Sequence, residues 1–179
     1  KLKVTRGSLI RVEKKTYSVP TGLIGRMVTV YIYEWRIEVR LGSKLVETLP
    51  RLIGKRETRI NYRHVIDALL RKPGGFRDYR HRDDLFPRLV FRQAWEALNK
   101  WHTPRQADIA YLRILNLAAK ISETQVAAAL EEALQSRERW NAEEIIARVT
   151  PQTRQAPPQV QQTVSLAVYD TLLQETYNG

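Results

Sequence analysis

Residues able to carry catalysis are sparse and poorly grouped in this sequence. Two of its three histidines have an aspartate three residues further on, as His64 precedes Asp67 and His81 precedes Asp84. This spacing places two ligands on one helical face, but neither pair has an evident third ligand, so a metal site is disfavoured. The chain contains no cysteine, which excludes thiolate catalysis, disulfides and cysteine-based zinc sites.

Motifs for phosphoryl transfer and nuclease chemistry are also missing from the sequence. No Gly-Lys-Ser/Thr of a nucleotide-binding loop occurs, and residues 8–49, which have the pattern of strands, contain no aspartate. An RNase H-like nuclease needs aspartates on adjacent strands to hold two metal ions. We therefore expect no catalytic residue, metal or other cofactor in this sequence.

Positive charge is concentrated in the first part of the chain. Residues 1–59 hold fourteen Lys or Arg against five acidic side chains and residues 60–105 hold ten against five, whereas residues 106–149 hold five against seven. The net charge is +11 and the pI is about 10.1. Such polarised basic charge is typical of proteins that bind phosphate backbones. The alternative is a solvated basic surface that maintains solubility.

Twelve basic residues in two groups are predicted to contact nucleic acid. Alternation along a strand places Arg36 and Arg40 on one solvent face, and the cations expected around them are Arg11, Lys14, Lys15, Arg26 and Lys44. In residues 76–92, arginines alternate with aromatic and histidine side chains, a composition suited to gripping a phosphate backbone. The arginines predicted to do so are Arg77, Arg80, Arg82, Arg88 and Arg92. Aspartates in the same stretch are expected to neutralise part of this charge.

Tyr31 and Tyr33 are open to two interpretations. Their rings have the chemistry to stack on bases. The favoured alternative is that they cover a second, smaller core against the helices, because large aromatic rings usually contribute to packing.

The elements that position the first basic group are strands. Alternation and turn residues predict strands at 8–13, 16–19, 26–34, 36–41 and 44–49, with a connection at Lys14-Lys15. Short antiparallel strands of this kind favour a small closed or nearly closed β-barrel over residues 1–52, since closure removes exposed edges. Residues 53–60 are expected to be a linker.

From residue 61 the period of the apolar residues becomes helical. Asn61 is a predicted N-cap, Thr103 and Gln106 form a predicted capping box, and Ser122 and Asn141 begin two further helices. Residues 61–149 are therefore expected to be a helical domain. The fold class is α+β: a small antiparallel β-barrel, then an α-helical array, then an extended C-terminal tail.

The tail has two parts. Residues 150–163 are rich in proline and glutamine and predict an extended linker. In residues 164–179, apolar side chains recur with helical spacing, and those predicted to dock into a partner's groove are Leu166, Tyr169, Leu172 and Leu173. The alternative is that this segment folds back onto its own helical domain. The absence of an initiator methionine leads us to expect a longer parent protein.

Several separate motifs resemble the C-terminal third of IstA-type insertion-sequence transposases. They are Tyr-Ser-Val-Pro at 17–20, Leu-Arg-Lys-Pro-Gly-Gly-Phe at 70–76, the Tyr-Arg-x-Arg-x-Asp-Leu-Phe-Pro pattern at 79–87, and Phe-Arg at 91–92. The resemblance implies that residues 8–49 are a Mu-transposase-type barrel that contacts double-stranded transposon-end DNA in an oligomer of transposase protomers. It also implies that a catalytic Asp-Asp-Glu domain binding Mg²⁺ lies outside this sequence.

The resemblance further implies that the tail engages the IstB-type AAA+ ATPase helper, and that the protein is bacterial, cytoplasmic and nucleoid-associated, without membrane contact. The fragment itself is then not an enzyme. Two other classes stay open from the residues alone. One is an RNA-binding small-barrel protein, which has a similar charge distribution. The other is a protein-docking module without DNA contact.

Overall fold

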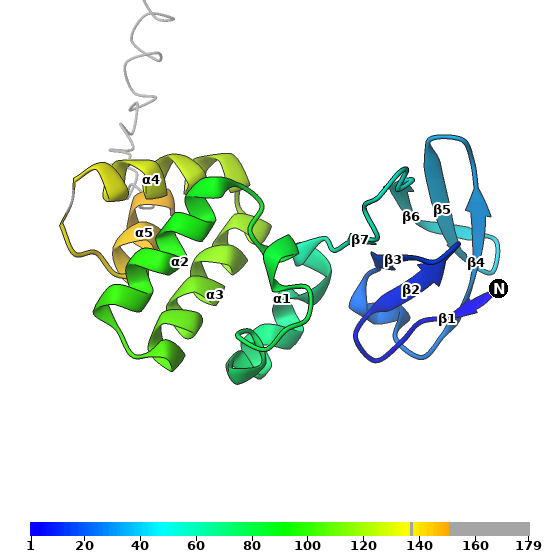
Figure 1. Ribbon diagram of the computed structural model, residues 1–179, viewed down its shortest axis with the longest axis horizontal. Helices are drawn as coiled ribbons and strands as arrows, with labels where there is room; N and C mark the ends of the chain where they lie inside the picture. Colours follow the sequence, from blue (N-terminus) through cyan, green and yellow to red (C-terminus); the bar gives the residue numbers. More distant parts are fainter. Residues whose placement is uncertain (137, 151–179) are drawn as a thin grey trace, which may run out of the picture.

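The chain folds into two units, each with its own hydrophobic core (Figure 1). The computed structural model describes residues 1–136 and 138–150. An N-terminal unit of strands, the β unit, is followed by a helical unit. The expected α+β order is confirmed.

The β unit contains two sheets, so the predicted closed barrel is wrong. A four-stranded sheet has the order β1-β4-β5-β6 and a three-stranded sheet has the order β2-β3-β7. The strands are β1 (Leu2–Lys3), β2 (Leu9–Val12), β3 (Lys15–Ser18), β4 (Met27–Ile32), β5 (Arg36–Leu41), β6 (Lys44–Pro50) and β7 (Thr58–Arg59). Hydrogen bonding stops between the sheets because Ser8 bends the chain at φ 63° and a 3-10 helix, η1 (Thr21–Leu23), separates β3 from β4.

The two sheets enclose one core. Apolar side chains at alternate positions point inward, and Val28, Ile37 and Val39 are buried as the alternation predicts. The three-stranded sheet adds Ile10 and Tyr17, whose hydroxyl accepts a hydrogen bond from the Leu52 backbone N–H at 2.9 Å. Fully burying each such apolar side chain stabilises the unit by roughly 1.5–3 kcal/mol.

The β2–β3 hairpin turns one residue earlier than expected. Val12 pairs with Lys15, so the two turn residues are Glu13 and Lys14, at φ 47° and 67°. A two-residue hairpin turn requires positive φ at both positions, and glycine or asparagine adopts positive φ with less strain than Glu13 or Lys14. The turn presents Lys14 at the surface of the β unit.

The segment expected as a linker, residues 53–60, is attached to the β unit. It contains β7, which pairs in parallel with β3 and is the one parallel pair among the described strands. The Lys15 ammonium donates to the carbonyl groups of Gly54 and Arg56 at 2.6 and 2.8 Å. The path from the β unit to the first helix is therefore fixed by hydrogen bonds.

The helices begin at the predicted capping residues. The Asn61 side chain accepts from the Arg63 backbone N–H, and Thr103 forms its capping box with Gln106. Ser122 and Asn141 cap the later helices in the same way. The helices are α1 (Tyr62–Arg71), α2 (Leu89–Trp101), α3 (Pro104–Lys120), α4 (Glu123–Gln135) and α5 (Ala142–Val149). Two 3-10 turns, η2 (Pro73–Gly75) and η3 (Arg82–Leu85), lie between α1 and α2.

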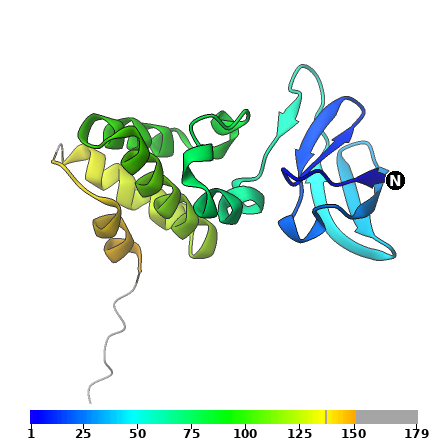
Figure 2. The ribbon, with the colours of Figure 1, turned by 90° about the horizontal axis from the view of Figure 1, so that it is seen from below.

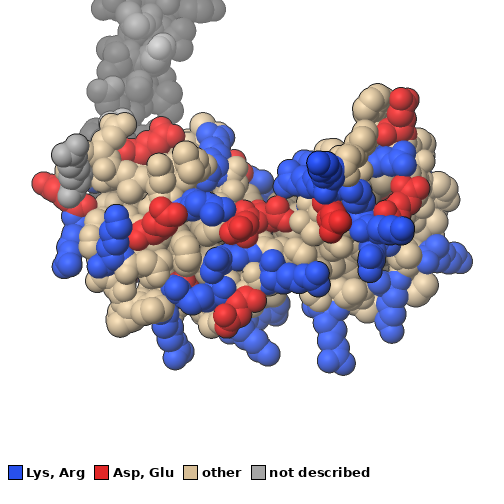
Figure 3. Space-filling model, viewed as in Figure 1, with Lys and Arg blue, Asp and Glu red and all other residues tan. Residues whose placement is uncertain are grey.

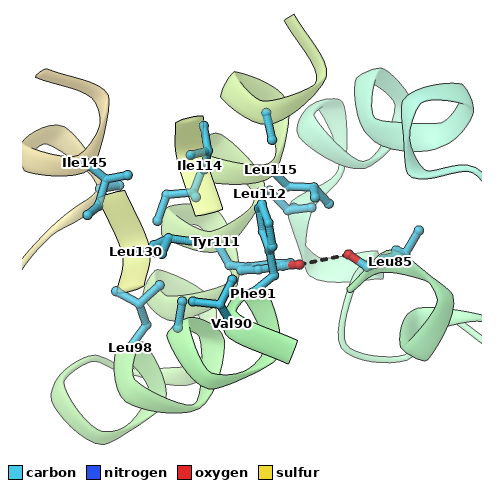
Figure 4. Close-up of a cluster of buried hydrophobic side chains, with 14 of the residues drawn as sticks. Leu85, Val90, Phe91, Leu98, Tyr111, Leu112, Ile114, Leu115, Leu130 and Ile145 are labelled. Atoms are coloured by element: carbon cyan, nitrogen blue, oxygen red, sulfur yellow. Dashed lines mark hydrogen bonds between the residues drawn. The ribbon is translucent and has the colours of Figure 1, made fainter. Parts of the chain in front are cut away.

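Helix α3 forms the centre of the helical core, and α1, α2, α4 and α5 all pack against it. Its buried side chains include Leu112, Ile114 and Leu115, which lie among residues of α2, α4 and α5 (Figure 4). The Tyr111 hydroxyl donates to the Leu85 carbonyl at 2.8 Å and so ties η3 to this core. This hydrogen bond fixes the middle of residues 76–92, the segment that contains the five arginines of the second basic group.

Candidate nucleic-acid interface

The best candidate interface is a basic cleft at the junction of the two units. It is a pocket of about 290 Å³ between the β2–β3 hairpin and the segment that precedes η3. Arg11 comes from β2, Lys14 from the hairpin turn, and Arg80 and His81 from the helical unit. Figure 2 shows the two units side by side, joined through β7 and α1. The junction brings together cations that lie far apart in the sequence.

The side chains of the basic cleft are suited to a phosphate backbone. Arg11, Lys14 and Arg80 are exposed, and within the described part of the chain none of them forms an ion pair. Thr5 and Thr16 add hydroxyl groups to the lining, whereas the Thr58 hydroxyl donates to Asp84 at 3.0 Å, and Glu57 is the one carboxylate of the lining. Cations and hydroxyls of this kind donate to phosphate oxygens without reading sequence. The cleft therefore fits a nucleic-acid backbone better than a neutral ligand.

A larger pocket on another side of the junction has mixed charge. Its volume is about 380 Å³, and its lining includes Arg56, Arg59 and Arg63 together with Glu47 and Asp84. Two of these arginines are paired: Arg56 lies 3.1 Å from Asp84, and Arg63 lies 3.6 Å from Glu123 of α4. The pocket offers less free positive charge than the basic cleft.

Most arginines of residues 76–92 hold the helical unit together. Arg77 donates to both carboxylate oxygens of Asp108, at 3.1 and 2.9 Å. Arg82 donates to the Arg77 carbonyl and lies 5.0 Å from the Trp95 ring centroid. The remaining pairs of the group are Arg88 with Glu123 and Arg92 with Asp83. Arg80 alone of the five predicted arginines reaches the basic cleft.

Asp108 organises these contacts. Its side chain is 5% exposed and also accepts from the Trp95 indole N–H at 2.9 Å. A buried carboxylate is stable only when it is paired and hydrogen-bonded. We therefore expect Arg77 to stabilise the fold, although it lies in a sequence segment whose composition is typical of DNA contacts.

The other predicted cations of the β unit do not join the basic cleft. Arg36 and Arg40 share one outward face, as predicted, but both donate to Glu38, at 3.2 and 3.0 Å. Lys15 is bound to backbone carbonyls. Arg26 and Lys44 are exposed at the ends of strands. Figure 3 shows Lys and Arg side chains projecting from one side of both units, with acidic groups among them at the junction.

The favoured interpretation of Tyr31 and Tyr33 is wrong. Their side chains are 49% and 41% exposed and cover no core. Each lies beside an arginine instead: the guanidinium of Arg40 is 5.4 Å from the Tyr31 ring centroid, and that of Arg36 is 4.4 Å from the Tyr33 ring centroid. The two rings therefore do not pack against the helices.

A serine, a histidine and a glutamate meet at the junction without forming a catalytic site. Ser18 Oγ lies 3.0 Å from His64 Nδ1, and His64 Nε2 lies 3.5 Å from Glu47. Ser18 is fully buried, and its hydroxyl oxygen also accepts from the Asn61 backbone N–H. Burial lowers the pKa of His64, although the Glu47 carboxylate opposes this shift. These residues join β3, β6 and α1, and the buried Ser18 hydroxyl already bonds the His64 ring and the Asn61 backbone N–H.

Three sequence predictions concern a metal site, a membrane span and the C-terminal tail. Across residues 1–136 and 138–150, no three His, Asp or Glu side chains gather in a possible metal site. None of the described helices combines the length and apolarity needed to cross a membrane. The predicted docking residues of the tail lie outside the described residues: Leu166, Tyr169, Leu172 and Leu173.

Sequence reasoning missed the partners that complete the basic cleft. Thr5, Thr16 and Thr58 carry no signal in a linear reading, because threonine is common on strands. His81 was considered as a metal ligand with Asp84 and as part of the arginine-rich stretch, but not as a neighbour of the hairpin cations. Its ring packs edge-on against Tyr79 at 5.8 Å, which directs it to the cleft. The parallel pairing of β7 with β3 places Thr58 opposite Thr16, a contact between residues 42 positions apart that no local pattern predicts.

Two comparisons with known proteins find similarity to this chain. Residues 1–61 match the family model described as Mu transposase, C-terminal domain, which supports a transposase C-terminal region. The chain is also 33% identical over 181 residues to an uncharacterised protein of Sinorhizobium fredii, y4jA/y4nE/y4sE. The match covers 98% of this chain and 36% of that protein, so the chain spans about a third of its relative's length. No solved structure matches the chain.

Proposed function

We propose that the chain is the non-catalytic DNA-binding and assembly region of a transposase. The basic cleft, with Arg11, Lys14 and Arg80 contributed by both units, is the observation that carries this proposal. The match of residues 1–61 to the Mu transposase C-terminal domain supports it. In this proposal the cleft holds the phosphate backbone of transposon-end duplex DNA, and sequence recognition lies elsewhere in the protein.

The finer form of the proposal is an IstA-type transposase of the Asp-Asp-Glu class. A separate domain then supplies catalysis with Mg²⁺, and neighbouring protomers assemble on the transposon ends in the bacterial cytoplasm and nucleoid. Residues 164–179 recruit an IstB-type AAA+ ATPase. Support for this form comes from the sequence motifs alone. Removing residues 164–179 should abolish co-sedimentation with the ATPase while leaving duplex binding unchanged, and retained co-sedimentation would refute this part.

Fluorescence anisotropy with duplex DNA tests the proposed DNA contact. The chain should bind a transposon-end duplex and a scrambled duplex with similar affinity. The affinity should fall with salt on a log-log slope of about −4 to −6, which corresponds to roughly five phosphate contacts. Absence of binding to both duplexes would overturn the proposal, and a preference for single-stranded RNA over both would favour an RNA-binding protein.

A further inference from the structure

The outward face of β4 and β5 concentrates exposed aromatic side chains. Tyr31, Tyr33 and Trp35 lie within five residues of one hairpin and are 49%, 41% and 69% exposed. Trp35 is the most exposed large apolar side chain that the structure describes. Large aromatic rings bury most of their area in a folded chain unless they contact a partner. We call the surface formed by Tyr31, Tyr33 and Trp35 the aromatic platform. Its exposure indicates a binding surface.

Two arginines and one glutamate order the aromatic platform. Glu38, whose side chain is 10% exposed, receives Arg36 at one oxygen and Arg40 at the other. This pairing holds the guanidinium groups beside the rings of Tyr33 and Tyr31. The arginines also lower the pKa of Glu38, the hydrogen bond from Arg40 contributing most, so this carboxylate stays ionised. The two tyrosines are thus held in place before any ligand binds.

We propose that the aromatic platform binds unpaired nucleotides by stacking. Tyr31 lies in β4, and Tyr33 follows the last residue of this strand and still donates its backbone N–H to the Arg36 carbonyl. At the spacing of extended chain, two positions correspond to about 7 Å. This is close to twice the rise of about 3.4 Å between successive bases of one strand. Each ring can therefore stack on one base that has left the stack of its own strand, with one further base between the two contacts, and the adjacent arginines can attract the phosphates.

The chemistry of the aromatic platform favours unpaired nucleotides over duplex DNA and over an apolar protein surface. A duplex hides the faces of its bases inside the helix, so it cannot stack on the tyrosines. An apolar protein surface would leave the arginines and Glu38 facing an uncharged partner, which costs free energy. Unpaired nucleotides match both properties, because they carry an apolar base and an anionic phosphate.

The aromatic platform is separate from the basic cleft. In Figure 1, β4 and β5 lie on the side of the β unit away from the helices, whereas the cleft lies at the junction. No residue of the platform lines the cleft. The proposal therefore goes beyond the proposed duplex contact, and one chain can hold a duplex and an adjacent single strand at the same time.

Binding of oligothymidylate tests the platform. An oligomer of about 15 nucleotides matches the usual length of such sites. Wild-type protein should bind it, and the double variant Tyr31→Ala/Tyr33→Ala should bind it at least about tenfold more weakly, as expected for two lost stacking contacts. The matched control, Tyr31→Phe/Tyr33→Phe, keeps both rings and should retain the affinity. All three proteins should bind duplex DNA equally, which shows that the variants are folded.

Tryptophan fluorescence gives a second readout. Trp95 and Trp101 are half-buried and Trp140 is buried, so quenching by oligothymidylate should come from Trp35 and should be lost in Trp35→Phe. Equal affinity of the alanine variant and the wild type, or no binding of oligothymidylate at all, would overturn the proposal. Concentration-dependent self-association that the alanine variant loses, without oligothymidylate binding, would assign the face to a second copy of the chain instead.

Discussion

Two basic regions of this protein, residues 76–92 and the β2–β3 hairpin, differ in how their cations are held. In the helical unit, Arg77 and Arg82 are held against a buried aspartate and an indole ring. In the β unit, Arg11 and Lys14 stand exposed beside the junction. Both regions were predicted from the sequence to contact nucleic acid through their cations. The difference teaches that a basic stretch offers free positive charge only where folding leaves its cations without carboxylate partners.

The largest expected effect is the loss of Arg77. Arg77→Ala leaves the buried carboxylate of Asp108 without its cation, which should lower the free energy of unfolding by about 3 kcal/mol. Urea unfolding followed by circular dichroism measures the change. Arg80→Ala, three residues away and exposed, is the matched control and should change stability by less than about 0.5 kcal/mol. Equal free energies of unfolding for the two variants would contradict the distinction between arginines paired with a buried carboxylate and exposed, unpaired arginines.

The junction between the units should respond to pH through His64. Burial lowers its pKa below the ordinary value of about 6.5. As the pH falls through 6.5, the unfolded histidine takes up a proton before the folded one does, so the free energy of unfolding should fall by at most about 1.4 kcal/mol per pH unit. Glu47 is the acidic group that faces this ring.

Urea unfolding between pH 7.5 and pH 5 checks this prediction. His64→Gln removes the titrating group, so its free energy of unfolding should depend less steeply on pH than that of the wild type. If the free energies of unfolding of the two proteins depend on pH in the same way, the pKa of His64 does not differ between the folded and unfolded states.

A smaller effect is expected for the exposed pair of Arg51 and Glu13. Its atoms lie 2.9 Å apart, as close as those of Arg77 and Asp108, but the Glu13 side chain is 56% exposed. Arg51→Ala should therefore cost about 0.5 kcal/mol, because water replaces the lost partner. Thermal unfolding of Arg51→Ala and Arg77→Ala under identical conditions sharpens the comparison. A loss as large as that of Arg77→Ala would mean that burial does not separate the two classes.

Local features of the fold could be predicted from the sequence. Asn61, Thr103 and Asn141 begin helices because their side chains accept backbone N–H groups within three residues. Strand β5 keeps its predicted bounds because inward Ile37 and Val39 alternate with polar residues. These features depend on a few neighbouring residues, which a linear pattern contains.

Features that depend on distant residues could not be predicted. Arg77 is neutralised by Asp108, 31 residues away, and no local pattern announces the pair. The sheets remain open because Ser8 and η1 interrupt the ladders, and β7 is too short to show alternation. Arg11 and Arg80 belonged to the predicted set, but their meeting at one cleft depends on the packing of the two units.

The central claim is that the basic cleft holds a duplex backbone. The most direct test compares two triple variants by anisotropy across a salt series. Arg11→Gln/Lys14→Gln/Arg80→Gln removes the cleft cations, whereas Lys100→Gln/Lys120→Gln/Arg139→Gln removes three exposed cations of the helical unit and changes the net charge equally. The cleft variant should lose affinity for duplex DNA, and its log-log salt slope should shrink by about 2.7, which corresponds to three lost phosphate contacts. The helical variant should keep the wild-type slope. Equal slopes for the two variants would contradict the claim.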